Sequence, residues 1–358
     1  MAKLPELCSI QYGYAFDSTC FTEDSTYLPL VRIRDVKRGY SETFYSGNYP
    51  NDYIIDNGSL LVGMDGEFNI ARWKGGKALL NQRVCKITAR KTVDEEYLRF
   101  ALTKALKEIE NRTSFVTVKH LSAKELNRLE IDIPDYRVQI SISGTLTKIE
   151  NIIFTRQQQL QKLDELVKAR FVELFGDTVL NPFGWEKALL STVCDVRDGT
   201  HDSPSYYETG YPLVTSKNVS SGKINLTDCS LICESDFKKI NERSKVDTGD
   251  IIMPMIGTIG KPVIVDIEPN FAIKNVALIK FKDSSRVLNA YVRALLMSDY
   301  FEDAVLSKVR GGTQKFISLG DIRKLCVLVP PMEKQEQFVM FVNQVDKSKL
   351  LQFFCFPI

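Results

Sequence analysis

One pattern occurs twice in this chain, in the same order, and this internal repeat constrains the fold more than any other feature. The segment at residues 30–162 returns in diverged form at residues 213–351. The runs PLV, IDNGSLL and VCKI of the first copy match PLV, VDTGDII and VALI of the second. The offset grows from 183 to 191 and then 196, at the pairs Leu30/Leu213, Gly58/Gly249 and Pro134/Pro330. Stepwise growth indicates loop insertions in the second copy, so we expect two related domains with pseudo-twofold symmetry.

The composition fits a soluble two-domain protein. The 358 residues suffice for two ordinary cores, and 44% of them are hydrophobic and 26% charged. No apolar run approaches the roughly 20 residues that span a bilayer, and the N-terminus lacks a long apolar signal core. We therefore expect a cytoplasmic protein. The net charge of +2 does not by itself indicate a class of partner.

The cysteines and histidines do not form a metal-binding pattern. The eight cysteines are scattered, without CxxC spacing. Cys229 and Cys233 are four residues apart, but no second pair accompanies them and the chain has only two histidines. We expect reduced thiols, no metal and no cofactor.

Each copy begins with a part rich in short strands. Runs at 28–33 and 58–63 have β-type composition between Gly, Asn and Asp residues, and runs at 249–254 and 275–280 repeat them. Helical stretches are expected at 94–111 and 288–306, followed by strands at 129–134 and 325–330. The predicted fold class is therefore α+β, with one mixed α/β domain in each copy.

A long helix closes each copy. Between Pro134 and Phe175 the chain has no further proline and one glycine, and about 40 helical residues would extend roughly 60 Å. Apolar residues follow heptad spacing, which predicts a coiled-coil seam of Ile142, Leu146, Ile149, Ile153, Leu160, Leu163, Val167 and Leu174. The second copy places Phe338, Val342 and Val345 where the first has Ile142, Leu146 and Ile149. We expect the two helices to pair in antiparallel orientation, as a twofold relation requires.

These expected elements divide the chain into five segments. They are a first domain at 1–133, a central helix at 134–176, a second domain at 177–329, a C-terminal helix at 330–352 and an atypical tail at 353–358.

The layout resembles the specificity subunit of type I restriction-modification systems. The resemblance rests on GYAFDS at 13–18, DGTHDSP at 198–204, PPMEKQEQ at 330–337, LQKL at 160–163 and FVELFG at 171–176. It implies two target-recognition domains that each read half of a bipartite double-stranded DNA site, and helices that space them and dock methyltransferase subunits. It also implies that an endonuclease subunit joins the complex, and that methylation and cutting belong to these partners.

Basic and polar residues near glycines are the candidate DNA contacts, because Arg, Lys, Asn and Gln read base edges and phosphates. In the first copy Arg32 and its neighbours form a strand flanked by loops; the candidates there are Arg34, Lys37, Arg38, Arg72, Lys74, Lys77, Arg112 and Lys119. In the second copy they are Thr200, His201, Lys217, Lys261, Lys274, Arg310, Gln314 and Lys315. For any single lysine, a solvated surface position is the alternative. We expect a turn held by Asp198 and Thr200 to present His201 to DNA, and His120 could equally be structural.

Motifs for catalysis are missing from this sequence. GTIGKP at 257–262 lacks the spacing of a phosphate-binding loop, and NPF at 181–183 lacks the second proline of a methyltransferase motif. A fused restriction-methylation enzyme and a coiled-coil adaptor that binds only protein are the alternatives.

The second helix departs from the family pattern. It is expected to end near Gln352, before an aromatic tail. Part of the central seam would then lack a partner within the chain, which predicts altered or impaired assembly.

Overall fold

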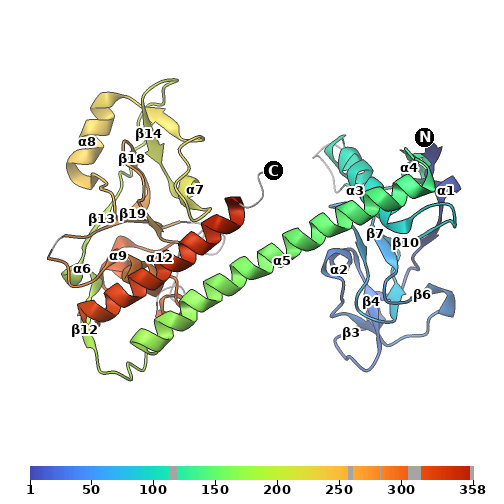
Figure 1. Ribbon diagram of the computed structural model, residues 1–358, viewed down its shortest axis with the longest axis horizontal. Coiled ribbons are helices and arrows are strands. Elements are labelled where there is room, and N and C mark those ends of the chain that lie inside the picture. Colours follow the sequence, from blue (N-terminus) through green and yellow to red (C-terminus); the bar gives the residue numbers. More distant parts are fainter. Residues whose placement is uncertain (113–118, 257–260, 283, 305–315, 355–358) are drawn as a thin grey trace. The chain divides into compact units, whose positions relative to one another are not determined.

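The computed structural model describes residues 1–112, 119–256, 261–282, 284–304 and 316–354. The chain divides into two compact units, Met1–Thr155 and Arg156–Ile358 (Figure 1). The division falls inside the long helix α5 (Tyr136–Phe175), so the segment boundaries expected at 134 and 177 stay predictions.

Two small sheets form the first unit. The first sheet is antiparallel and has the order β2 (Cys8–Tyr12), β10 (Val84–Ala89), β7 (Leu60–Gly63) and β8 (Ile70–Arg72). The second has the order β3 (Phe21–Thr22), β5 (Phe44–Tyr45), β4 (Leu28–Val31), β9 (Ala78–Leu80) and β6 (Ile54–Ile55). Strands β4 and β9 pair in parallel, with Leu30 opposite Leu79.

Helices cover one face of the four-stranded sheet in this unit. Helix α3 (Glu95–Arg112) buries Leu98, Leu102 and Leu106 against Leu60 and Ile87 of the sheet. These three leucines are four residues apart, which is the spacing that predicted the helix. The remaining elements are β1 (Ala2–Lys3), which pairs with β11 (Glu130–Ile131), and the helices α1 (Leu4–Leu7), α2 (Ile33–Arg38) and α4 (Ala123–Arg128).

The four-stranded sheet has the same strand order in the second unit. Its antiparallel sheet has the order β13 (Asp195–Asp198), β19 (Val276–Lys280), β16 (Ile251–Pro254) and β17 (Val263–Ile264). A second sheet has the order β15 (Ser230–Ile232), β14 (Tyr211–Val214) and β18 (Ala272–Ile273), and β14 and β18 again pair in parallel. Strands β12 (Glu186–Leu189) and β20 (Cys326–Val329) pair as β1 and β11 do. The helices are α6 (Leu190–Val193), α7 (Ser216–Val219), α8 (Glu234–Ser244), α9 (Asn289–Leu296), α10 (Asp299–Ala304), α11 (Leu319–Arg323) and α12 (Met332–Phe354). The α+β repeat predicted from the sequence is confirmed.

Two details show how closely the units correspond. Gly13 and Gly199 each pass against a neighbouring strand, where an added Cβ would lie 2.0 Å from the carbonyl oxygen of Asn81 or 2.5 Å from that of Ile273. The helices α4 and α11 each start with a capping box, formed by Ser122 with Glu125 and by Ser318 with Asp321. At Gly13 and Gly199 the backbones approach so closely that only glycine fits. The two capping boxes satisfy free N–H groups at the helix starts.

In the second unit, α12 lies antiparallel to the C-terminal half of α5 (Figure 1). Phe338 near the start of α12 contacts Phe171 and Phe175 near the end of α5, with ring centroids 5.6 Å apart in both cases. Further along α12, Lys349 pairs with Asp164 at 2.6 Å. From Phe338 to Lys349 the residue numbers on α12 rise, while those of the contacted residues on α5 fall to Asp164. The predicted antiparallel pairing is therefore confirmed for this half of α5.

The predicted seam residues differ in burial along the two helices. Leu174 is buried, Val345 is buried at 5% exposure, and Leu160, Leu163, Val167 and Val342 are half-buried. In the first unit Leu146 is half-buried, whereas Ile142, Ile149 and Ile153 are 38%, 47% and 52% exposed. The N-terminal half of the seam therefore presents apolar side chains at its surface.

Three predictions of local structure were wrong. Residues 33–38 form helix α2 rather than the end of a strand, because Asp35 accepts the N–H of Arg32 and Gly39 closes the helix in the left-handed region at φ 79°. The helix expected at 288–306 is interrupted after Leu296, where the hydroxyl of Ser298 donates to the carbonyl of Leu295 and α10 begins at Asp299. The strand expected at 129–134 is only two residues long. Among the described residues, no helix is long and apolar enough to cross a membrane.

Candidate nucleic-acid interface

The basic residues of α2 form an exposed surface on the first unit. Arg34, Lys37 and Arg38 are exposed, and their ion pairs are loose: Lys37 lies 3.6 Å from Glu67 and Arg38 lies 3.8 Å from Glu42. Exposed pairs of this kind contribute little to stability and can be exchanged for a phosphate. These three side chains are therefore available to an anionic ligand.

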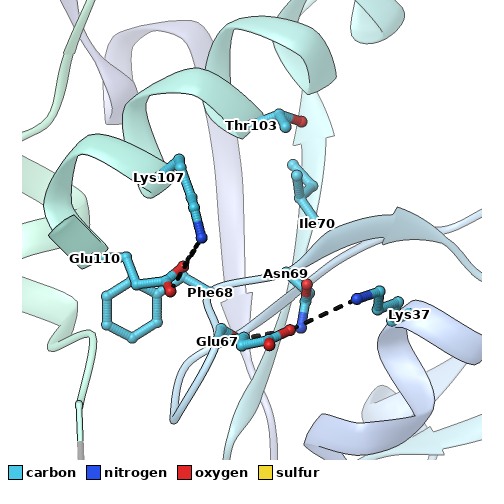
Figure 2. A pocket seen from close by; sticks show the side chains of 8 residues that line it. All are labelled: Lys37, Glu67, Phe68, Asn69, Ile70, Thr103, Lys107 and Glu110. Carbon is cyan, nitrogen blue, oxygen red and sulfur yellow. Dashed lines mark hydrogen bonds and ion pairs between the residues drawn. The ribbon is translucent and has the colours of Figure 1, made fainter. Parts of the chain in front are cut away.

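A hollow of about 340 Å³ lies between α2, the loop before β8 and helix α3 (Figure 2). Its lining is Lys37, Glu67, Phe68, Asn69, Ile70, Thr103, Lys107 and Glu110. Figure 2 shows each lysine directed at a glutamate, and Lys107 donates to Glu110 at 3.2 Å. Because the charges are matched within the hollow, it does not concentrate positive charge as a phosphate site would.

The loop after β8 approaches the end of α2. The N–H of Lys74 donates to the carbonyl of Gly39 at 3.0 Å, which brings Lys74 beside α2, and both Lys74 and Lys77 are exposed. The structure thus joins two groups of candidates that are about 35 residues apart in the sequence.

Arg72 occupies a different environment, since its guanidinium contacts protein groups on several sides. It donates to Glu96, to Glu95 at 2.9 Å and to the carbonyl of Gly58 at 2.7 Å. Burial opposes its charge, but the hydrogen bonds that it donates to Glu96 and Glu95 outweigh that effect and raise the pKa of Arg72. These contacts favour a structural role that ties β8 to α3.

The two candidates at the end of α3 and after it differ in their exposure to solvent. Arg112 is exposed at the C-terminal end of α3. Lys119 is half-buried, and its ammonium group donates to the carbonyl of Glu110 at 2.6 Å. This contact neutralises the negative end of the α3 dipole and gives Lys119 a helix-capping role.

In the second unit, Thr200, His201 and Lys274 lie at one edge of the sheets. Thr200 forms a parallel bridge with Lys274, and the ammonium group of Lys274 donates to the hydroxyl of Ser203 at 2.7 Å. Thr200 also accepts the N–H of Asp202 at 3.1 Å, as the expected turn requires. Lys217 lies exposed on α7, the counterpart of α2, and Lys261 is exposed next to residues that are not described.

The His201 ring is fixed by two acceptors. Nε2 lies 2.9 Å from the carboxylate of Asp198, and Nδ1 lies 2.9 Å from the amide oxygen of Asn275. The hydrogen bonds to Asn275 and Asp198 raise the pKa of His201, because both favour a proton on the facing nitrogen. A ring with both nitrogens so occupied acts as a brace between β13 and the β18–β19 turn, and base reading by His201 stays a prediction.

Three further candidates, Arg310, Gln314 and Lys315, lie outside the described residues. Sequence reasoning also missed polar residues at the turns next to the central strands, namely Gln82 and Arg83 in the first unit and Asn275 in the second. The criterion of basic residues beside glycines does not mark them, since the neighbours of their side chains come from distant parts of the chain.

The fold and this surface define a class: two copies of one α/β domain, each with basic side chains on its loops, connected by a single long helix. The chain belongs to the family of the type I restriction modification DNA specificity domain, whose model matches residues 1–165 and 182–352, one match for each copy.

Known proteins support this assignment. The chain is 28% identical over 374 residues to the type I restriction enzyme EcoBI specificity subunit of Escherichia coli, covering 96% of this chain and 78% of that one. The fold is similar to the S subunit of a type I restriction-modification system from M. genitalium, with a TM-score of 0.59, 15% identity, and coverage of 98% and 90% of the two chains. It is also similar to a chain from a structural study of assembly and conformational transition in the type I R-M system, with a TM-score of 0.51, 18% identity, and coverage of 99% and 92%. At these identities the two structures show a common fold.

Proposed function

We propose that this chain is the DNA specificity subunit of a type I restriction-modification complex, and that each unit reads one half of a bipartite site on double-stranded DNA. The observation that carries the proposal is the family match, which occurs once on each copy of the repeat. The exposed basic side chains of α2, the Lys74–Lys77 loop and the Thr200–Lys274 edge support it. Such residues supply phosphate contacts, while polar residues beside them can read base edges.

The long helix has a mechanical role in this proposal. A single helix of 40 residues has a length of about 60 Å, and each unit holds one end of it. In the first unit Arg99 makes a bidentate pair with Glu150, at 3.0 and 2.7 Å. In the second unit Phe171 and Phe175 are buried against Tyr291 and Phe338. A helix fixed at both ends would act as a ruler for the unread gap between the half-sites.

The exposed apolar residues of α5 support the expected protein partners. Ile142, Ile149, Ile153 and Phe154 are between 38% and 58% exposed. In a complex, methyltransferase subunits would cover this face, because burial of apolar surface drives association. Methylation and cutting would then belong to the methyltransferase and endonuclease subunits, and this chain would have no catalytic role.

The test is reconstitution with the methyltransferase subunits. The complex should bind one bipartite sequence, and its affinity should fall linearly with salt concentration on a logarithmic scale. Exchanging one unit for that of a relative with another target should change one half of the recognised sequence. Retention of the parental sequence by such a chimera would contradict the two-reader model, and a complex that binds no DNA would favour the adaptor alternative.

A further inference from the structure

The two units carry a corresponding turn at the same place in the fold. In the first unit, the N–H of Gly13 donates to the carbonyl of Val84 and that of Tyr14 donates to Leu80. In the second, Gly199 donates to Val276 and Thr200 donates to Ile273. These hydrogen bonds frame residues 81–83 between β9 and β10, and residues 274–275 between β18 and β19. Asn81 therefore corresponds to Lys274, and Arg83 corresponds to Asn275.

In the first unit this turn presents an exposed arginine beside a carboxylate. The Arg83 side chain is 51% exposed, and its Nε lies 3.3 Å from Oδ2 of Asp65, which is itself only 19% exposed. The other oxygen of Asp65 contacts Nδ1 of His120. One carboxylate thus holds both an arginine and a histidine that are distant in the sequence.

The hydrogen bonding leaves the outer end of Arg83 available. Nδ1 of His120 lies nearer to Asp65 than to Nη1 of Arg83, which is 3.4 Å away. Both contacts use Nδ1 of His120, which can serve as a hydrogen-bond partner to only one of them at a time. Asp65 faces Nε and His120 faces Nη1, so both N–H groups of Nη2 and the second N–H of Nη1 are directed away from these two contacts.

We infer that Arg83 is a base-reading residue of the first unit, held by Asp65 and His120 so that its terminal nitrogens contact a guanine. Bidentate contact with O6 and N7 of guanine is the commonest specific arginine contact in the major groove. Fixing the guanidinium plane in advance reduces the conformational entropy lost on binding. A lysine cannot substitute at such a site, since its ammonium group lacks the planar pair of donors.

The corresponding position of the second unit supports this inference. Asn275 occupies it in the left-handed region, at φ 54°, and its amide oxygen faces Nδ1 of His201 at 2.9 Å. In both units, then, a polar side chain at the end of this turn lies beside a histidine and a carboxylate. These neighbours come from different elements, because the counterparts of Asp65 and His120 in the second unit are Ile256 and Phe316, whereas Asp198 and His201 lie at the end of β13. The turn occupies the same place in the fold, while its length, its polar side chain and the neighbours of that side chain differ, as two readers of different half-sites require.

The inference rests on the proposed function, and its experiment separates the two. The reconstituted complex is tested against a library in which each base of the preferred bipartite site is varied. In Arg83→Ala, discrimination at one position of the first unit's half-site should fall about 5- to 150-fold, while the other half-site keeps its discrimination. Arg83→Lys should lose the same discrimination but keep more of the affinity for unrelated DNA. Asp65→Asn should weaken the discrimination, and Arg128→Ala, an exposed arginine on α4, should not change it.

The outcomes are distinguishable. A wild-type complex without any preferred sequence would refute the proposed function itself. A specific wild-type complex whose Arg83→Ala variant discriminates normally at every position would overturn the inference. If Arg83→Lys retained full discrimination, Arg83 would be a phosphate contact, and the inference would again be wrong. Loss at both half-sites in Arg83→Lys would indicate a structural role and would also overturn it.

Discussion

Replacement of Gln335 should destabilise the second unit selectively. This glutamine lies in the first turn of α12, and its side chain is completely buried. Its amide oxygen accepts the N–H of Leu288 at 2.8 Å, and its amide nitrogen donates to the carbonyls of Pro330 and Arg286, at 2.8 and 3.0 Å. It therefore joins the start of α12 to the segment that leads into α9.

The size of the effect follows from the polar groups that would lose their partner. In Gln335→Ala the N–H of Leu288 and the carbonyl of Pro330 would lose a buried hydrogen bond, at a cost of about 1–3 kcal/mol each. We expect the free energy of unfolding of the second unit to fall by about 2–6 kcal/mol. For a unit of this size, each kcal/mol lowers the melting temperature by about 2–4 °C.

The two tryptophans allow each unit to be followed alone. Trp73 is buried in the first unit and Trp185 lies in the second, where its indole N–H donates to the carbonyl of Phe175 at 3.1 Å. In a Trp73→Phe background, tryptophan fluorescence reports denaturant unfolding of the second unit. The matched control is Gln344→Ala, which alters an exposed glutamine of the same helix.

Two results would refute this reasoning. One is a midpoint for Gln335→Ala equal to that of the Gln344→Ala control. The other is an equal loss in both units, seen by repeating the experiment in a Trp185→Phe background. Gln139 makes the corresponding contacts in the first unit, to the N–H of Asp94 at 2.9 Å and the carbonyl of Pro134 at 2.8 Å. Its replacement should therefore produce the converse pattern.

Three further predictions concern the glycine approach, the histidine brace and the helix pair. Gly199→Ala should lower the unfolding midpoint of the second unit strongly, because its Cβ would lie 2.5 Å from a backbone oxygen. In Gly144→Ala, on α5, the added Cβ meets nothing within 4 Å, so this variant should stabilise the protein by about 0.5–1 kcal/mol in equilibrium denaturation. The raised pKa of His201 implies a stabilising contribution that is complete below the unfolded pKa of about 6.5 and is lost as pH rises through the higher folded pKa. Thermal melts across this window should show a decline in the second unit that is absent in His201→Gln. Phe338→Ala should cost about 3–5 kcal/mol in the second unit by denaturant unfolding, because it removes a fully buried ring from contact with Phe171 and Phe175; an exposed-site change, Met340→Ala, is its control.

Most of the fold could be predicted from the sequence because it depends on local periodicity. Leu98, Leu102 and Leu106 predicted α3, and the apolar series after Pro134 predicted α5. The segment at 33–38 was not predictable in this way. Its apolar residues Ile33 and Val36 continue a β-type run, and the helix depends on Asp35 reaching back to the N–H of Arg32. A short side-chain contact of this kind outweighs the intrinsic preference of the surrounding residues.

The candidate site was only partly predictable, for a related reason. Basic residues beside glycines located α2 and the Lys74–Lys77 loop, but the same criterion selected Arg72, whose guanidinium is bound to Glu95 and Glu96. It also overlooked Arg83. Composition records that a charge is present, whereas the partner of that charge is set by strands that meet only in the folded chain.

The repeat contains one sequence signal for the turn at Arg83. Insertions make the offset between the copies grow from Leu30 onward, but at this turn it falls by one, from 193 at Leu80/Ile273 to 192 at Val84/Val276. The second unit thus connects the same two strands with one residue fewer, and Asn275 accepts a left-handed conformation to do so. Loops often differ in length between related domains, so the difference in length gains weight here only together with the different polar side chain that each turn presents. Arg83 and Asn275 are different polar side chains at one place in the fold, each beside a histidine, and such a difference is what separate DNA targets would select.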